Sequence, residues 1–130
     1  MLQHNDVQFF FQEEAESYSH HTLFPTIFYS KQVQQLQYLQ ILKLGMYIGV
    51  GGVITFKNAK KLPDVVKILP EDRILLETDC PYLSPEPLRG KLCHSGLITF
   101  TAQKVAEIKN ASTENILNLT LQNAKCLFNL

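Results

Sequence analysis

The chain has 130 residues, which is enough for one domain with a hydrophobic core. Hydrophobic residues make up 45% of it and charged residues 18%, as in an ordinary soluble globular protein. Its 12 basic and 12 acidic residues cancel, which argues against a strongly basic protein that coats nucleic acid but not against an enzyme that only cuts it.

Residues 1–30 differ in composition from the rest of the chain. They contain four acidic residues and no Lys or Arg, and all six glycines of the chain lie at Gly45 or later. Their apolar residues follow neither the helix period nor the strand period for long. We therefore predict a divergent or poorly ordered segment at residues 1–30 and a regular domain at residues 31–130.

The first regular elements are a helix and a strand. Apolar residues recur every three positions from residue 33 to residue 42, and Gly45 stands where the C-cap glycine of a helix is expected. Residues 46–56 are rich in β-branched residues and glycine, which predicts a strand followed by a loop.

A second helix and a second strand follow. We predict the helix at residues 58–69, with Asn58 as its N-cap, Pro63 near its start and Pro70 after its end. Residues 74–79 (ILLETD) are nearly all apolar before an acidic end, as in a parallel strand that is covered on both faces.

The remainder is predicted to be a loop and two helices. Residues 80–91 contain three prolines, whereas residues 98–110 and 112–130 are amphipathic. Asn110 can take the left-handed conformation between the helices, and Ser112 can cap the second one. The alternation of helices and strands implies right-handed βαβ crossovers, and so an α/β fold with a parallel sheet.

Acidic residues stand at the carboxyl end of the second strand, where functional groups gather in parallel α/β folds. Asp79 opens onto the loop, so it is a candidate ligand for a divalent metal ion and a candidate base for a metal-bound water. Glu77, two residues earlier, points to the same side, and we expect it to support the site by pairing with Lys57 or Arg89. The alternative is that Asp79 only forms a turn or an ion pair.

The loop after Asp79 carries candidate substrate contacts. Arg89 can grip a phosphate with its planar guanidinium group, Gly90 lets the backbone turn, and Lys91 adds a point charge. His94 is the histidine nearest to this site in the sequence and is a further candidate contact. The alternative for all three side chains is a solvated loop surface.

Two other patterns do not predict a site. The run Gly49-Val50-Gly51-Gly52 matches neither a dinucleotide-binding motif nor a P-loop, so we interpret its glycines as relieving crowding at a barrel rim. His20 and His21 are adjacent, so on a strand they point to opposite faces and cannot chelate one metal ion.

The cysteines and the N-terminus bear on the compartment. The three cysteines form no Cys-x-x-Cys pair, which indicates reduced thiols in a cytoplasmic protein. The first 30 residues lack the features of a signal peptide, and no stretch approaches the roughly 20 apolar residues that span a membrane. We expect a cytoplasmic protein without membrane contact.

Several segments together resemble the later part of TatD-family hydrolases. They are residues 45–66 (GMYIGVGGVITFKNAKKLPDVV), residues 68–91 (ILPEDRILLETDCPYLSPEPLRGK) and the closing QNAKCLFNL. The combination of ETDxPYL, RGK and NAxxLF is specific, and the resemblance covers roughly residues 39–130. Members of this family are metal-dependent deoxyribonucleases of the amidohydrolase type, built on a (β/α)8 TIM barrel.

The resemblance implies that the chain is the C-terminal part of such a barrel, with Asp79 as metal ligand and general base. It also implies a divalent metal ion, Mg²⁺ or a similar ion with Zn²⁺ or Mn²⁺ as alternatives, and DNA as the substrate. The family's early His-x-His pair, its Glu and its two later His are not matched. Counting back from Gly45 puts the last of these His at Tyr29, and residues 93–95 replace a common Asn-Glu-Pro.

An incomplete barrel leaves rival predictions for function. A full barrel needs roughly 200 residues or more, and a catalytic metal ion needs about three protein ligands, so we expect a truncated enzyme with little or no activity alone. The alternative is a non-catalytic α/β fragment that binds a partner or associates with itself through exposed sheet edges. A third possibility keeps the fold but changes the substrate, because related amidohydrolases cleave lactones or cyclic amides.

Overall fold

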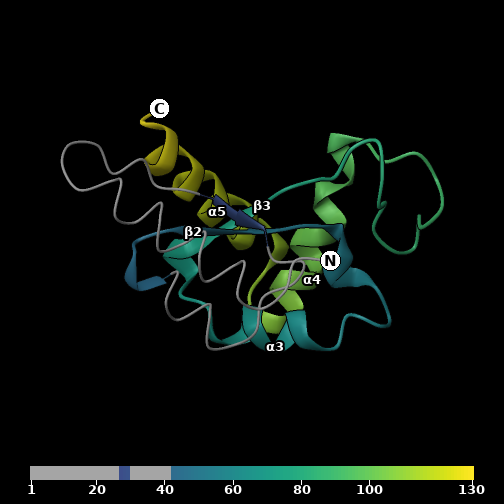
Figure 1. Ribbon diagram of the computed structural model, residues 1–130, viewed down its shortest axis with the longest axis horizontal. Helices are drawn as coiled ribbons and strands as arrows, with labels where there is room; N and C mark the ends of the chain where they lie inside the picture. Colours follow the sequence, from purple (N-terminus) through teal and green to yellow (C-terminus); the bar gives the residue numbers. More distant parts are fainter. Residues whose placement is uncertain (1–26, 30–41) are drawn as a thin grey trace, which may run out of the picture.

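Three short parallel strands form the sheet. The computed structural model describes residues 27–29 and 42–130, and within them the strands are β1 (Ile27–Tyr29), β2 (Tyr47–Val50) and β3 (Ile74–Leu76). Their order in the sheet is β1-β2-β3, so β2 is the central strand (Figure 1). The register pairs Ile27 with Tyr47 and Ile48 with Ile74. The predicted parallel pairing is confirmed.

β1 lies in a segment for which the sequence predicted no regular element. A strand of three residues is too short to show an alternation of apolar and polar side chains. Tyr29 ends β1 and pairs with Gly49, so the position reached by counting back from Gly45 is the carboxyl end of a strand. The proposed division at residue 30 and most of the helix predicted before Gly45 lie outside the described residues.

Helices alternate with the strands and follow them. They are the 3-10 turns η1 (Gly52–Thr55), η2 (Glu71–Arg73) and η3 (Ser95–Leu97), and the α-helices α3 (Lys61–Ile68), α4 (Ile98–Lys109) and α5 (Thr113–Phe128). Within the described residues, none of the helices is long and apolar enough to cross a membrane.

The predicted end of α4 and start of α5 are confirmed. Asn110 takes the left-handed conformation, with φ 54°, and closes α4. Ser112 caps α5, because its hydroxyl oxygen accepts a hydrogen bond of 3.1 Å from the backbone N–H of Asn115. Gly45 also has the positive φ, +73°, expected of a glycine after a helix.

The predicted start of α3 is wrong. The N-cap residue is Lys60, without a side-chain cap, and Asn58 lies in the preceding turn. Pro63 is the third residue of the helix, where its missing N–H costs no hydrogen bond, so the helix can begin at Lys61. Asn58 is then too far from the first free N–H groups to cap them.

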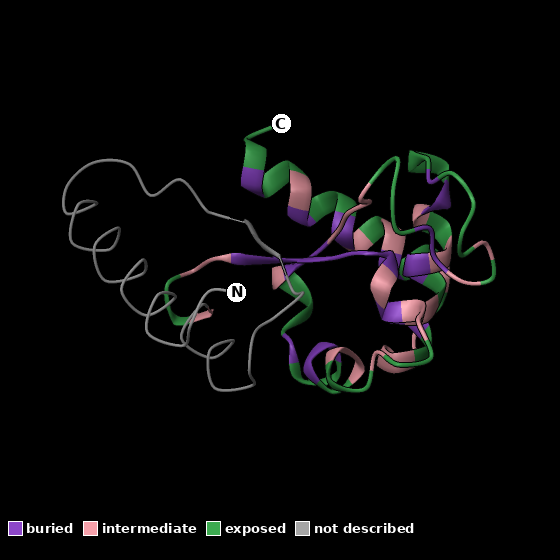
Figure 2. Cartoon of the chain, turned by 45° about the vertical axis from the view of Figure 1, so that its right-hand side comes forward, coloured by how far each residue is buried: buried purple, intermediate pink, exposed green. Residues whose placement is uncertain are grey.

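The core lies between the sheet and the helices. Figure 2 shows buried residues on β2 and in stripes along the helices. Ile48 and Ile74 are fully buried on one face of the sheet, and Tyr47 and Leu75, 7% and 5% exposed, are buried on the other, which confirms that β3 is covered on both faces. Helix residues of the same cluster as Ile48 and Ile74 include Val66, Val105 and Ile116.

Two polar side chains of the C-terminal helices donate hydrogen bonds to backbone carbonyl oxygens of the preceding segments. The amide of Asn123, in α5, donates hydrogen bonds of 2.8 Å to the carbonyl oxygens of Glu71 and Ile74, at the start of β3. The ammonium group of Lys109, at the end of α4, donates to the carbonyl oxygens of Lys67 and Leu69, where α3 ends. β3 is therefore fixed at its N-terminal end by α5.

Candidate metal centre and its loop

The acidic residues follow β3 directly, although this strand is shorter than predicted. Regular structure ends at Leu76, but the N–H of Glu77 still donates a 3.1 Å hydrogen bond to the carbonyl oxygen of Val50. The carbonyl oxygen of Asp79 accepts a 2.8 Å hydrogen bond from the N–H of Tyr82, which turns the chain into the loop. Glu77 and Asp79 thus stand at the carboxyl end of the parallel sheet.

The two carboxylates converge on Gly51, the residue that follows β2. A Cβ atom at Gly51 would lie 2.6 Å from Oε1 of Glu77 and 3.7 Å from Oδ2 of Asp79. Both side chains therefore point to the same side, as predicted from their spacing. Oδ2 of Asp79 is also buried from solvent. The absent side chain of Gly51 provides the space in which the carboxylates meet.

The neighbouring glycine serves the loop. A Cβ atom at Gly52 would lie 3.1 Å from the carbonyl oxygen of Leu83 and 3.3 Å from the ring of Pro85. The interpretation of these glycines as relieving crowding is confirmed for Gly51 and Gly52. Within the glycine run, one residue makes room for the carboxylates and the next makes room for the loop backbone.

Carboxylate oxygens are the hard donors that Mg²⁺ and Mn²⁺ prefer, so this pair fits one side of a divalent metal site. Across residues 27–29 and 42–130, no group of three or more His, Cys, Asp or Glu side chains is placed to hold a metal ion. A complete site would need further ligands from outside these residues.

Side-chain hydrogen bonds fix the loop after Asp79 against η1. The hydroxyl of Thr55 donates to the carbonyl oxygen of Gly52 at 2.7 Å and accepts from the N–H of Glu86 at 2.8 Å. The buried hydroxyl of Ser84 donates to the carbonyl oxygen of Lys91 at 2.7 Å. These bonds close the loop on itself and onto the segment after β2.

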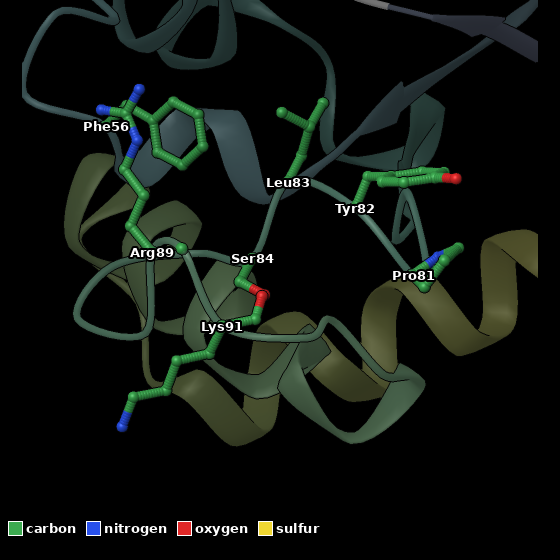
Figure 3. A pocket seen from close by; sticks show the side chains of 8 residues that line it. Phe56, Pro81, Tyr82, Leu83, Ser84, Arg89 and Lys91 are labelled. Atoms are coloured by element: carbon green, nitrogen blue, oxygen red, sulfur yellow. The ribbon is translucent and has the colours of Figure 1, made fainter.

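An open pocket of about 340 Å³ lies in this loop. Its lining comprises Phe56, Pro81, Tyr82, Leu83, Ser84, Arg89, Gly90 and Lys91 (Figure 3). The guanidinium group of Arg89 lies 4.3 Å from the ring centre of Phe56, in a cation–π contact. Figure 3 shows the ammonium end of Lys91 pointing the opposite way. The two cations therefore face different directions, although their backbones share the pocket.

The remaining predicted contact, His94, lies at the end of this loop. It is exposed and precedes η3, and its ring faces Gly96, where a Cβ atom would lie 3.1 Å from the ring atoms Nδ1 and Cε1. His94 does not line the pocket that contains Arg89 and Lys91.

Two cysteines meet beside Asp79. The sulfur atoms of Cys80 and Cys93 are 3.8 Å apart, and the hydroxyl oxygen of Thr78 lies 3.1 Å from the sulfur of Cys80. Cys93 is buried and Cys80 is exposed. Burial raises the pKa of the Cys93 thiol above 9.0, and its contact with Cys80 adds to that rise.

The sequence did not single out Thr55, Phe56, Ser84 or Asn123 as residues that shape the site. Thr55 and Phe56 lie shortly after the glycine run, and no local motif marks them as loop contacts. Their partners are about 31 and 33 residues away, so spacing alone does not pair them.

Comparison with known proteins agrees with this geometry. Residues 5–129 match the family model described as TatD related DNase. The chain is 45% identical over 91 residues to the uncharacterized metal-dependent hydrolase YabD of Bacillus subtilis, which covers 70% of this chain and 36% of the relative. It is 38% identical over 91 residues to YcfH of Escherichia coli, named in the same way, with 70% and 34% covered.

Solved structures resemble the described fold. The TatD homologue YjjV of Escherichia coli superposes with a TM-score of 0.73 at 28% identity, over 81% of this chain and 40% of that one. A TatD family hydrolase of Entamoeba histolytica gives a TM-score of 0.68 at 21% identity and covers 78% of this chain and 41% of its own length. At this identity the similarity is evidence for the fold only. The three parallel strands and their helices are thus part of a (β/α)8 barrel.

The chain spans about a third of the length of the curated relatives that it matches. The match nevertheless extends over nearly all of its own residues and includes the strand end that carries Glu77 and Asp79. This chain belongs to the TatD family of hydrolases.

Proposed function

We propose that this chain contributes the carboxylate side of a metal-dependent hydrolase site that cleaves phosphodiester bonds in DNA. The observation that carries the proposal is the convergence of the Glu77 and Asp79 carboxylates beside Gly51, at the carboxyl end of the sheet. The names of the relatives, metal-dependent hydrolase and TatD related DNase, support the same chemistry.

Asp79 has the central role in this proposal. One carboxylate oxygen would hold a divalent metal ion such as Mg²⁺, and the other would accept the proton of the attacking water. A metal ion held there would supply positive charge to polarise the phosphate and to lower the pKa of a water molecule. Glu77 lies against the same gap and would fix the position of Asp79 and of the water molecules around it.

The loop supplies the positive charge for the substrate. Arg89 is held by Phe56, so its guanidinium group is oriented before substrate binds. Because Lys91 points the other way, the two side chains would contact different phosphates of one DNA strand. His94, at the end of the same loop, would contact the substrate outside the pocket.

Cleavage of a fluorescently labelled single-stranded oligonucleotide tests the role of Asp79. The described residues bring two carboxylates together, so we expect slow Mg²⁺-dependent cleavage or none from the 130-residue chain alone. Any cleavage that EDTA stops should also be lost in Asp79→Asn and kept in Asp64→Asn, a matched change on the exposed start of α3. EDTA-sensitive cleavage that survives Asp79→Asn contradicts the proposal.

DNA binding tests the loop separately from catalysis. The chain offers a matched pair of arginines, because Arg89 lies over Phe56 and Arg73 lies over Tyr47, 5.2 Å from its ring centre. We expect Arg89→Gln to weaken binding of single-stranded DNA and to reduce the salt dependence by about one ion, while Arg73→Gln leaves both unchanged. Fluorescence anisotropy at several salt concentrations measures both quantities. Equal effects of the two changes would contradict a role of Arg89 in binding the substrate.

A further inference from the structure

The thiols of Cys80 and Cys93 form a pair that the hydrolase site does not use. They stand 13 residues apart, at the two ends of the loop that carries the pocket, yet their sulfur atoms are 3.8 Å apart. The third cysteine of the chain, Cys126, is exposed on α5.

The backbone holds the two thiols together. The N–H of Cys93 donates a 3.0 Å hydrogen bond to the carbonyl oxygen of Pro81, so the two ends of the loop lie side by side. The hydroxyl of Ser84 bridges the same two segments through its bond to the carbonyl oxygen of Lys91. The short sulfur–sulfur distance therefore follows from how the loop closes and not only from the choice of two side-chain rotamers.

The two thiols differ in access to solvent. Cys80 is exposed, whereas Cys93 is only 4% exposed. A small molecule in solution can therefore reach Cys80 directly, whereas the buried Cys93 has the Cys80 sulfur within 3.8 Å. This asymmetry matches the two steps of thiol–disulfide exchange, in which one thiol is attacked from outside and a second one resolves the mixed disulfide.

We propose that Cys80 and Cys93 are a reversible dithiol modification site for low-molecular-weight disulfides of the glutathione type. The Cys80 sulfur forms a bond to one sulfur of the small disulfide, whose other sulfur leaves as a thiol. The Cys93 sulfur then bonds to the Cys80 sulfur and releases the second small thiol. Two protein thiols are oxidised to one disulfide, and the small disulfide is reduced to two thiols that carry both protons.

The movement needed to close the bond is small. A disulfide has a sulfur–sulfur distance of about 2.0 Å, so the present 3.8 Å must shorten by nearly half. Since Cys80 is exposed, its side chain has room to turn toward Cys93. The hydroxyl of Thr78 would give up its contact with the Cys80 sulfur, an exposed interaction.

The test uses the full chain with Cys126→Ser, so that only the two loop thiols remain. The folded protein is equilibrated in buffers of reduced and oxidised glutathione, alkylated and digested with trypsin. We expect one disulfide-linked species that joins the peptides 74–89 and 92–104, which trypsin releases at Arg73, Arg89, Lys91 and Lys104. Mass spectrometry identifies it.

Three comparisons decide the result. We expect the disulfide to form in the folded protein at a glutathione ratio at least about tenfold less oxidising than in urea, because folding places the thiols together. In Cys93→Ser, Cys80 should accumulate as a mixed disulfide with glutathione, and in Cys80→Ser, Cys93 should react at least about tenfold more slowly. Equal disulfide formation in urea, a stable mixed disulfide while both thiols are present, or faster reaction of Cys93 would each overturn the proposal.

Discussion

Replacement of Gly51 by alanine tests the geometry of the carboxylate pair most specifically. The backbone at Gly51 has φ −96° and ψ 177°, which alanine adopts without strain, so the effect of the new methyl group is purely steric. That methyl group would lie 2.6 Å from Oε1 of Glu77, and an ordinary contact begins at 3.4 Å. The Glu77 carboxylate must therefore move by about 0.8 Å or more.

The size of the effect depends on what can move. The atom in conflict is the end of a flexible side chain, so we expect Gly51→Ala to cost about 1 kcal/mol of unfolding free energy, the low end of the range for overpacking. At Gly52 the conflict is with the carbonyl oxygen of Leu83 and the ring of Pro85, which cannot turn aside. Gly52→Ala should therefore cost about 2–3 kcal/mol.

Urea unfolding of a double-mutant cycle measures this directly. In a Glu77→Ala background the conflict disappears, and Gly51→Ala should stabilise the protein by about 0.4–1 kcal/mol, because alanine restricts the unfolded chain. The sign of the effect thus reverses between the two backgrounds. The same loss of stability in both backgrounds would refute the contact between Gly51 and Glu77.

Two further predictions concern the side chains of α4 and α5 that donate hydrogen bonds to the backbone of α3 and β3. Asn123→Ala should lower the unfolding free energy by about 2–3 kcal/mol, since it removes two hydrogen bonds, one of them the buried bond to the carbonyl oxygen of Ile74. Asn118→Ala, on the exposed side of the same helix, should change it by less than about 0.5 kcal/mol in urea unfolding, and equal effects would contradict the anchoring role. Burial lowers the pKa of Lys109 in the folded protein below its ordinary value of 10.5. Between the folded-state pKa and 10.5, the unfolded chain binds more protons at this group than the folded chain does. The unfolding free energy should therefore rise with pH in that range. In Lys109→Met, the midpoint of urea unfolding should no longer rise over this pH range. A rise that is unchanged in this variant would show that other titratable groups cause it.

The parts of the fold that could be predicted depend on local signals. The apolar run of residues 74–76 predicts that β3 is buried. The left-handed Asn110 and the capping Ser112 follow from the conformational and hydrogen-bonding preferences of Asn and Ser. β1 could not be predicted, because its three residues gain their structure only by pairing with β2. The N-cap at Asn58 was wrong because a competing requirement, the position of Pro63, sets the start of α3.

The candidate site divides in the same way. The spacing of Glu77 and Asp79 was sufficient to place both on one side of the strand, and the glycine run was sufficient to suggest crowding. Contacts that join distant segments had no signal in the sequence. The stacking of Arg89 on Phe56 and the meeting of the two loop thiols arise from how residues 80–94 fold back onto η1.

Oxidation of the loop thiols offers a link to the carboxylates. Cys80 follows Asp79 directly, and the Asp79 carbonyl oxygen accepts the hydrogen bond that begins the loop. If the site binds a metal ion as proposed, closing the disulfide should weaken the Mn²⁺ affinity several-fold, and oxidised glutathione should leave the Mn²⁺ affinity of the Cys80→Ser protein unchanged. Titration of Mn²⁺ into oxidised and reduced protein measures the difference. Equal affinities would show that the thiol pair does not influence the carboxylate site.

Binding of Mn²⁺ by the 130-residue chain, followed by electron paramagnetic resonance of the free ion, tests the central claim most directly. The convergence of Glu77 and Asp79 predicts weak binding that Asp79→Asn abolishes and that Glu77→Gln reduces about tenfold. The matched change Asp64→Asn, on the exposed start of α3, should leave the affinity unchanged. Binding of Mn²⁺ with equal affinity by the Asp79→Asn protein and the wild type would contradict the assignment of Asp79 as a metal ligand.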